Sequence, residues 1–224
     1  LYTALHPVKS GAWPNHTYVY DGVRSIAHFL QDNGYRAALS GKTHINPPKS
    51  FPFEYLKGPG TKNNPNFPAV DQFLSECVSQ DQPFGLILTS NEPHTPWDKG
   101  DASAYPPEDL ILPDPLVDTP ATRSDFSAYL AEITYFDSQV GEALAALEKH
   151  GLVENTLVVV LTEQGNAFPF AKWTCYDIGL GSGMVVRWPG TVTPNSSTDA
   201  LVEYVDIIPT FLDSASLPMP SGLD

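Results

Sequence analysis

The chain has 224 residues, of which 42% are hydrophobic, and its formal net charge is −14. This hydrophobic content is sufficient for a packed core and excludes a wholly disordered chain. The negative charge argues against a nucleic-acid backbone as the main partner, because such partners require clustered lysine and arginine. A small anionic substrate stays possible, since a local group of cations can oppose the overall field. No stretch is long and apolar enough to predict a membrane span.

Helical and strand-like patterns alternate along the chain. Apolar residues recur at three- and four-residue spacing in the segments predicted as helices, which are 21–34, 69–79 and 124–151. We expect Asp21 to cap the first of these helices and Gly34 to end it. Short apolar runs between turn formers predict strands at 36–39, 84–89, 157–161 and 183–188. A strand end with a short helix is expected at 202–215, and long loops at 47–68 and 96–122.

This alternation predicts an α/β fold. Strands that alternate with helices imply right-handed crossovers and a mostly parallel sheet sandwiched between helices. The run Leu157-Val158-Val159-Val160-Leu161 is expected to be a strand buried on both faces of that sheet.

Polar side chains follow three of the predicted strands, where ligands of open α/β sheets bind. These are Lys42 and His44, then His94, then Glu163 and Gln164. A carboxylate and an amide oxygen suit a hard cation such as calcium or magnesium. The alternative for the last pair is a solvated turn at the strand end.

Lysines and histidines around a cation are suited to a tetrahedral oxyanion, such as a sulfate or phosphate ester. The lysine charge stabilises oxygens as the ester bond breaks, and histidine donates hydrogen bonds or relays protons. Lys42, His94 and a further lysine, Lys172, are the candidates. Their alternatives are surface charge for the lysines and a rigid loop histidine for His94, which lies between prolines.

Several of these segments resemble motifs of the sulfatase family. The sequence GKTH at 41–44, after NGYRAA at 33–38, resembles the family motif in which GYRT precedes GK-x-H. The sequence PHTP at 93–96 resembles the family's proline–histidine motif, and KWT at 172–174 resembles the segment with its second sulfate-binding lysine. Segment 137–165 is similar to the long helix of the family and the strand that precedes its metal ligands. Segment 204–210 is similar to a structural segment found later in the family. The resemblance spans nearly the whole chain, and is greatest to the heparan N-sulfatase branch and its bacterial relatives.

The resemblance implies an alkaline-phosphatase-like core that hydrolyses sulfate esters or N-sulfate groups of a sulfated carbohydrate. It implies a formylglycine nucleophile and a calcium ion, with Glu163 and Gln164 as metal ligands. It places Lys42, His44, His94 and Lys172 around the sulfate, with Lys42, His94 and Lys172 binding the substrate. A secreted, periplasmic or lysosomal location is the family expectation.

Two departures from the family pattern define what we expect of residues 1–224. The family has Asp followed by Asn or His where this chain has Glu163-Gln164, so the ligand geometry differs. The nucleophile motif C-x-P/A-S-R and an N-terminal aspartate pair are absent, and both are expected just before Leu1, since residues 1–7 resemble the family helix that follows the nucleophile. Neither Cys77 nor Cys175 has the surroundings to replace that nucleophile. The chain is therefore expected to be a partial catalytic domain, incomplete at both ends and inactive alone.

Two other readings stay open from the sequence. One is a phosphomonoester, phosphodiester or phosphonate hydrolase of the same superfamily. The other is a non-catalytic glycan-binding relative that kept these side chains and lost the nucleophile. The pattern leaves the sulfate position and the oligomeric state open.

Overall fold

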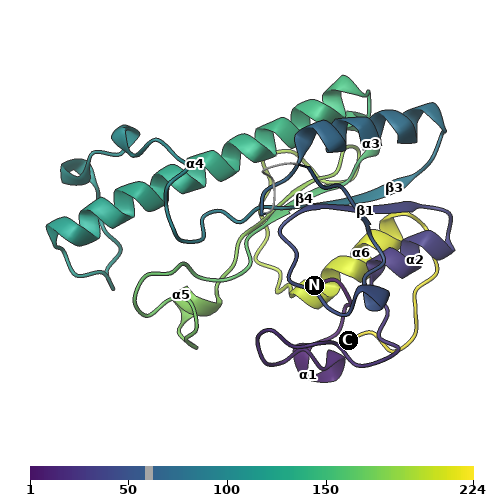
Figure 1. Cartoon of the computed structure of the whole chain (residues 1–224), viewed down its shortest axis with the longest axis horizontal. Coiled ribbons are helices and arrows are strands. Elements are labelled where there is room, and N and C mark those ends of the chain that lie inside the picture. Colours follow the sequence, from purple (N-terminus) through teal and green to yellow (C-terminus); the bar gives the residue numbers. More distant parts are fainter. Residues whose placement is uncertain (59–62) are drawn as a thin grey trace. The chain divides into compact units, whose positions relative to one another are not determined.

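The structure is a computed structural model that describes residues 1–58 and 63–224 (Figure 1). The chain forms two compact units. Unit 1 contains residues 1–89 and 195–224, and unit 2 contains residues 90–194. Both units combine helices with strands, so the predicted α/β class is confirmed.

Unit 1 contains a parallel sheet with the strand order β2-β1-β3. The strands are β1 (Arg36–Gly41), β2 (Glu54–Tyr55) and β3 (Phe84–Thr89). Strand β1 lies in the middle and pairs with β3 in register from Arg36 opposite Phe84 to Gly41 opposite Thr89. Its four central residues are buried, as a continuous apolar run in a parallel sheet requires. The strands predicted at 36–39 and 84–89 are confirmed as β1 and β3, and β1 extends beyond its predicted end to Gly41.

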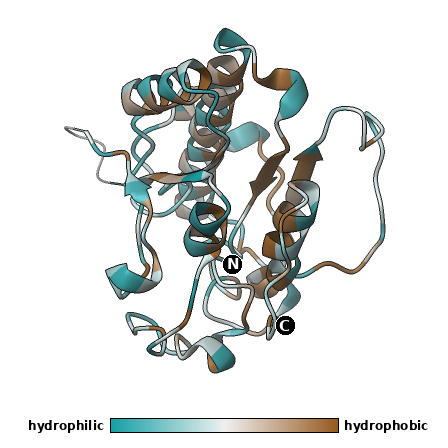
Figure 2. Cartoon of the chain, turned by 90° about the vertical axis from the view of Figure 1, so that its right-hand side faces the viewer, coloured by the Kyte–Doolittle hydropathy of each residue, from teal (hydrophilic) through white to brown (hydrophobic). Residues whose placement is uncertain are grey.

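Helices cover both faces of this sheet (Figure 1). Helix α3 (Phe67–Ser79) covers one face, where the rings of Phe73 and Phe84 meet edge to face at 5.9 Å. Helices α2 (Ile26–Asp32) and α6 (Ile207–Ser214) cover the other face and share one hydrophobic core with β1. Figure 2 shows strands in brown, the hydrophobic end of its scale. The remaining elements of unit 1 are α1 (Pro7–Ser10), η1 (Pro48–Ser50) and η5 (Tyr204–Asp206).

The start of α2 corrects one prediction. The helix begins at Ile26, and Ser25, not Asp21, occupies its N-cap. The backbone N–H of Ser25 donates to His28 Nδ1 at 3.2 Å, while the carboxylate of Asp21 accepts from Lys49 Nζ at 2.6 Å. Asp21 is therefore engaged by another segment and lies outside the helix. The predicted loop at 47–68 contains η1 and β2, and its residues 59–62 lie outside the described residues.

Unit 2 contains the longest helix, α4 (Pro120–Lys149), which confirms the helix predicted at 124–151. Short turns precede and follow it: η2 (Ala102–Ala104), η3 (Pro107–Asp109), η4 (Val153–Asn155) and α5 (Asp177–Leu180). The buried hydroxyl of Ser127 on α4 donates to the carbonyls of Ala102 and Tyr105 and so holds the preceding loop. No helix among residues 1–58 and 63–224 is both long and apolar enough to cross a membrane.

The strand that ends before Glu163 differs from its prediction. Strand β4 (Val158–Leu161) pairs antiparallel with β5 (Met184–Arg187), and each residue of β4 is half-buried. The sequence predicted that this strand, β4, would be buried on both faces of a parallel sheet. A short apolar run predicts a strand with an apolar environment, but it contains no information on the direction of its partner.

Candidate active site

Lys42 is fixed by the backbone at the carboxyl end of β1. Its N–H donates to the carbonyl of Thr89 at 3.1 Å, and Thr89 Oγ1 donates to the carbonyl of Lys42 at 2.6 Å. The preceding Gly41 has φ +108°, a conformation that side-chain-bearing residues rarely adopt. Its absent Cβ would lie 1.9 Å from the Thr89 carbonyl oxygen. The half-buried Lys42 thus lies directly after the end of the strand, as predicted.

His44 follows in the same unit and has a partner that the sequence did not predict. Its Nε2 lies 2.9 Å from Nδ1 of His16, and both side chains are exposed. His16 comes from the loop between α1 and α2, which has no periodic pattern. The two histidines are 28 residues apart, and no sequence pattern predicts a contact at that separation.

His94 lies in a turn at the start of unit 2. Its backbone N–H donates to the Asn91 carbonyl at 2.9 Å, and its Nδ1 lies 2.7 Å from the carbonyl oxygen of Thr95. A carbonyl oxygen only accepts, so the proton of this hydrogen bond resides on Nδ1. In the neutral ring Nε2 is therefore an acceptor, and in the protonated ring it is a donor. The exposed His94 can thus serve either role through Nε2.

An aromatic cluster in unit 2 connects the turn of His94 to the segment that contains Lys172. The cluster consists of Trp97, Phe126, Tyr129 and Phe168. Trp97 Nε1 donates to the carbonyl of Pro93, and its ring stacks on Phe168 with centroids 4.8 Å apart. Burial raises the pKa of the Tyr129 hydroxyl. His94 and Lys172, the two predicted sulfate-binding residues of this unit, are therefore carried by segments that share one packed core.

Lys172 ends a compact turn that begins at Asn166. Its N–H donates to the Asn166 carbonyl at 2.8 Å, and the Asn166 side chain accepts from the N–H of Phe168 at 3.0 Å. Phe170 and Trp173, on either side of the half-buried lysine, have φ of +69° and +76°. Such conformations cost about 1–3 kcal/mol each and are concentrated at binding and catalytic sites.

The predicted metal ligands come directly after β4. Glu163 is exposed and Gln164 is half-buried. Among the residues that the structure describes, no group of three or more His, Cys, Asp or Glu side chains is placed to hold a metal. Calcium takes roughly six to eight oxygen ligands, so this pair fits as one part of a ligand set.

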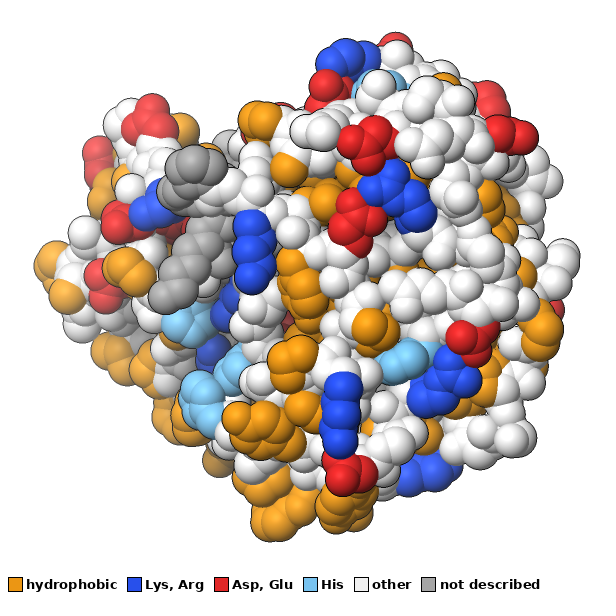
Figure 3. All heavy atoms as spheres, turned by 45° about the vertical axis from the view of Figure 1, so that its right-hand side comes forward, with side chains coloured by type: hydrophobic (Ala, Val, Ile, Leu, Met, Phe, Trp, Pro, Cys, Tyr) orange, Lys and Arg blue, Asp and Glu red, His pale blue; other side chains and the backbone are white. Residues whose placement is uncertain are grey.

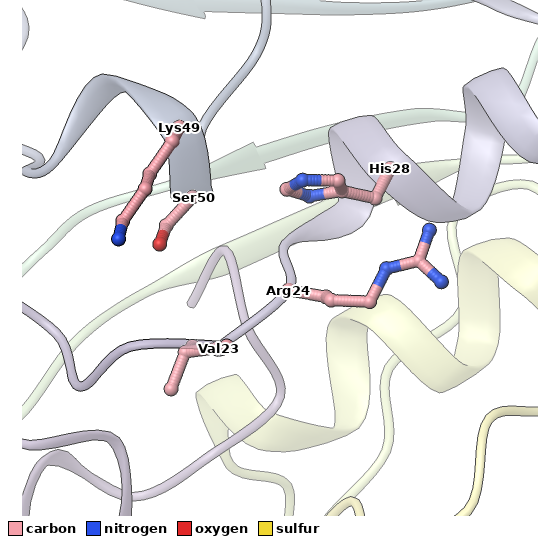
Figure 4. A pocket seen from close by; sticks show the side chains of 6 residues that line it. Val23, Arg24, His28, Lys49 and Ser50 are labelled. Carbon is pink, nitrogen blue, oxygen red and sulfur yellow. The ribbon is translucent and has the colours of Figure 1, made fainter.

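A separate hollow of about 340 Å³ lies on unit 1 (Figure 4). It is lined by Gly22, Val23, Arg24, His28, Lys49 and Ser50. Lys49 is paired with Asp21 at 2.6 Å, and this partner lowers the pKa of the Asp21 carboxyl. Arg24 is paired with Asp32 at 2.5 Å. Both cations already have carboxylate partners, so this hollow is a poorer anion site than the end of β1. Figure 3 shows one face of the molecule, on which several Lys and Arg side chains, in blue, lie beside Asp and Glu side chains, in red.

The aromatic cluster yields a stability prediction. Phe168 is 8% exposed, so Phe168→Leu should remove ring contacts with its three neighbours and lower the free energy of unfolding by about 1–2 kcal/mol. Phe170→Leu is the matched control, because that ring is 55% exposed and its loss should change stability by less than about 0.5 kcal/mol. Urea unfolding of both variants measures the difference. Equal effects would mean that the cluster does not stabilise this turn.

Comparison with known proteins identifies the family. The family described as Sulfatase matches residues 1–217. An ulvan-active sulfatase of Formosa agariphila is 26% identical over 230 residues, which cover 100% of this chain and 45% of that protein. The N-sulphoglucosamine sulphohydrolase of Homo sapiens is 26% identical over 270 residues, which cover 99% of this chain and 51% of that protein.

The fold agrees with this match. The structure of Ps i-CgsB in complex with k-i-k-neocarrahexaose aligns with a TM-score of 0.78 at 22% identity, over 100% of this chain and 62% of that chain. The chain spans about half the length of the curated relatives it matches. From the match over residues 1–217, the chain belongs to the sulfatase family.

Proposed function

We propose that the whole protein hydrolyses sulfate esters or N-sulfate groups of a sulfated carbohydrate. Membership of the sulfatase family supports the reaction. An ulvan-active sulfatase and an N-sulphoglucosamine sulphohydrolase among the relatives support a glycan substrate. The structural observation that carries the proposal is the fixed backbone of Lys42 at the carboxyl end of β1, in hydrogen bonds to Thr89. By family membership we place the protein in a secreted, periplasmic or lysosomal location.

Each of the four predicted catalytic residues has a role in this proposal. Lys42 and Lys172 stabilise negative charge on the sulfate oxygens as the bond to the carbohydrate breaks. His44 and His94 donate hydrogen bonds to the sulfate or move protons to and from the reacting oxygens. Nε2 of His94 is the atom suited to this transfer, because its Nδ1 is hydrogen-bonded to the Thr95 carbonyl oxygen.

A formylglycine nucleophile and a calcium ion belong to the same proposal. The nucleophile is assigned to no residue of this chain. Glu163 and Gln164 supply oxygen donors of the kind that calcium prefers, and other segments complete the set. When bound, the ion supplies a fixed positive charge beside the sulfate.

Substrate comparison tests the proposed reaction. The whole protein should release sulfate from sulfated saccharides faster than it hydrolyses an aryl phosphate or a phosphonate monoester. The reverse order of rates would favour the phosphoester reading. Binding of sulfated saccharides without any turnover would favour a non-catalytic glycan-binding protein.

Glu163→Ala tests the metal assignment. Loss of one charged oxygen donor should weaken calcium binding, so the variant should need more calcium for activity and lose calcium-dependent thermal stabilisation. Melting temperatures measured across a calcium titration report this directly, and a chelator should abolish the stabilisation of the wild type. Glu142→Ala is the matched control, because Glu142 is an exposed carboxylate of α4. A Glu163→Ala titration midpoint equal to that of the control would remove Glu163 from the metal site.

A further inference from the structure

The pair of imidazoles at the end of β1 has a defined geometry. His44 Nε2 lies 2.9 Å from His16 Nδ1, and the ring centroids are 4.6 Å apart with the planes inclined at 52°. At this distance the two nitrogens share one proton, one ring donating and the other accepting. Nε2 of His44 is therefore occupied whichever ring donates. Only Nδ1 of His44 is left for a second partner.

The backbone holds His16 in the position that makes this contact. His16 has φ +61°, a left-handed conformation that is uncommon for a side-chain-bearing residue. A hydrogen bond from the N–H of Val19 to the carbonyl of Asn46, at 3.1 Å, ties its loop to the segment that contains His44. Thr17 Oγ1 also donates to the Pro14 carbonyl at 2.6 Å and closes the turn around His16. The pair thus results from two loops that are hydrogen-bonded to each other.

We propose that His16 is a positioning residue that holds the His44 ring by Nε2 and presents its Nδ1 to the sulfate group. This inference rests on the proposed function, because it assigns a role to His44 in binding the sulfated substrate. A hydrogen bond at one ring nitrogen fixes which nitrogen faces the other partner. Holding the ring also removes rotational freedom that His44, as an exposed side chain, would otherwise lose on binding substrate.

The left-handed backbone of His16 decides which substitutions are informative. Gly and Asn both tolerate positive φ, so His16→Gly and His16→Asn remove the imidazole without straining the loop. In the whole protein, His16→Gly should lower kcat by about 10-fold to 100-fold with a smaller change in KM, because ring orientation is lost. Free imidazole should restore part of this activity in His16→Gly, where the missing ring leaves space. Should His16→Gly fail to fold, His16→Asn gives the same comparison of kcat with KM.

Substitutions of His44 identify the nitrogen that faces the substrate. The side-chain nitrogen of Asn lies as many bonds from Cα as Nδ1 of His, and that of Gln as many as Nε2. His44→Asn should therefore retain more activity than His44→Gln. In a double-mutant cycle, adding His16→Gly to His44→Asn should cost less than His16→Gly costs alone, because the residue that it positions is already gone. The proposal would be overturned if His44→Gln were more active than His44→Asn, or if the losses of activity caused by His16→Gly and His44→Asn were additive.

A second readout does not depend on activity. In ¹⁵N-labelled protein, long-range ¹H–¹⁵N spectra report the protonation of each imidazole nitrogen. The wild type should show a hydrogen-bonded Nε2 on His44, and this signature should be lost in His16→Gly. An unchanged His44 spectrum in His16→Gly would overturn the pairing.

Lys42→Ala distinguishes failure of this inference from failure of the proposed function. If Lys42→Ala keeps wild-type turnover, the assignment of the sulfate site to the end of β1 is wrong. If Lys42→Ala loses turnover while His16→Gly keeps it, only the role of His16 is wrong.

Discussion

Lys42→Ala and Lys172→Ala should each lower the turnover of sulfated substrate by about 10²–10³-fold, because each removes one fixed charge that stabilises the transition state. The loss should appear mainly in kcat, since the stabilised charge develops as the bond breaks. Both lysines have backbones fixed by hydrogen bonds, to Thr89 and to Asn166 respectively, so replacement should remove charge without displacing the segment. Steady-state kinetics of the two variants measure the effect.

Lys49→Ala is the matched control for this prediction. Lys49 is an exposed lysine of unit 1 whose charge is already paired with Asp21. Its replacement should leave kcat within about twofold, because a solvent-exposed ion pair contributes little and this charge is already paired with a carboxylate. Wild-type turnover in Lys42→Ala or Lys172→Ala would return that residue to ordinary surface charge, the alternative that the sequence left open.

Gly41→Ala should be the most damaging single-methyl substitution at the site. The new Cβ would lie 1.9 Å from the Thr89 carbonyl oxygen, and φ +108° is unfavourable for alanine. Either β1 and β3 must separate or the chain must change conformation, so we expect a loss of about 3–5 kcal/mol in the free energy of unfolding. Lys42 is hydrogen-bonded to the same Thr89, so turnover should fall with stability. Denaturant unfolding together with kinetics measures both effects.

Gly34→Ala distinguishes the cost of positive φ for alanine from the cost of steric overlap with a new Cβ. Gly34 also has positive φ, at +80°, but a Cβ there would meet nothing within 4 Å. This variant should lose only about 1 kcal/mol, the cost of the backbone conformation. If the two glycine variants lose equal stability, close approach of Thr89 is not what requires glycine at position 41.

The sequence was sufficient for most of the elements of unit 1. The run Phe84–Thr89 was predicted with its observed bounds because an apolar strand between turn formers is a local signal. The start of α2 was misplaced because Asp21 and Ser25 are both good N-caps; in the structure Ser25 occupies the N-cap, and Asp21 pairs with Lys49, which is distant in sequence. The direction of β4 depended on its pairing with β5, which no local pattern of apolar residues encodes.

The candidate site shows the same division between local and distant signals. Lys42, placed directly after a strand, was located by position alone. The partner of His44 could not be located in this way, because His16 lies in an aperiodic loop and contacts His44 only in the folded chain, where the Val19–Asn46 hydrogen bond joins the two loops. Likewise, Trp97 and Phe168 lie far apart in the sequence, and their stacking became evident only in three dimensions.

The discontinuity of unit 1 has a consequence for biosynthesis. Its core includes Leu212 of α6, which is 0% exposed, yet α6 is translated only after the whole of unit 2. At roughly 5–20 residues per second, the ribosome takes on the order of ten seconds to proceed from β3 to α6. Throughout that interval the apolar side of α2 and β1 lacks its partner helix in the nascent chain. Unit 1 can therefore complete its core only after α6 has been synthesised, which is later than the synthesis of the whole of unit 2.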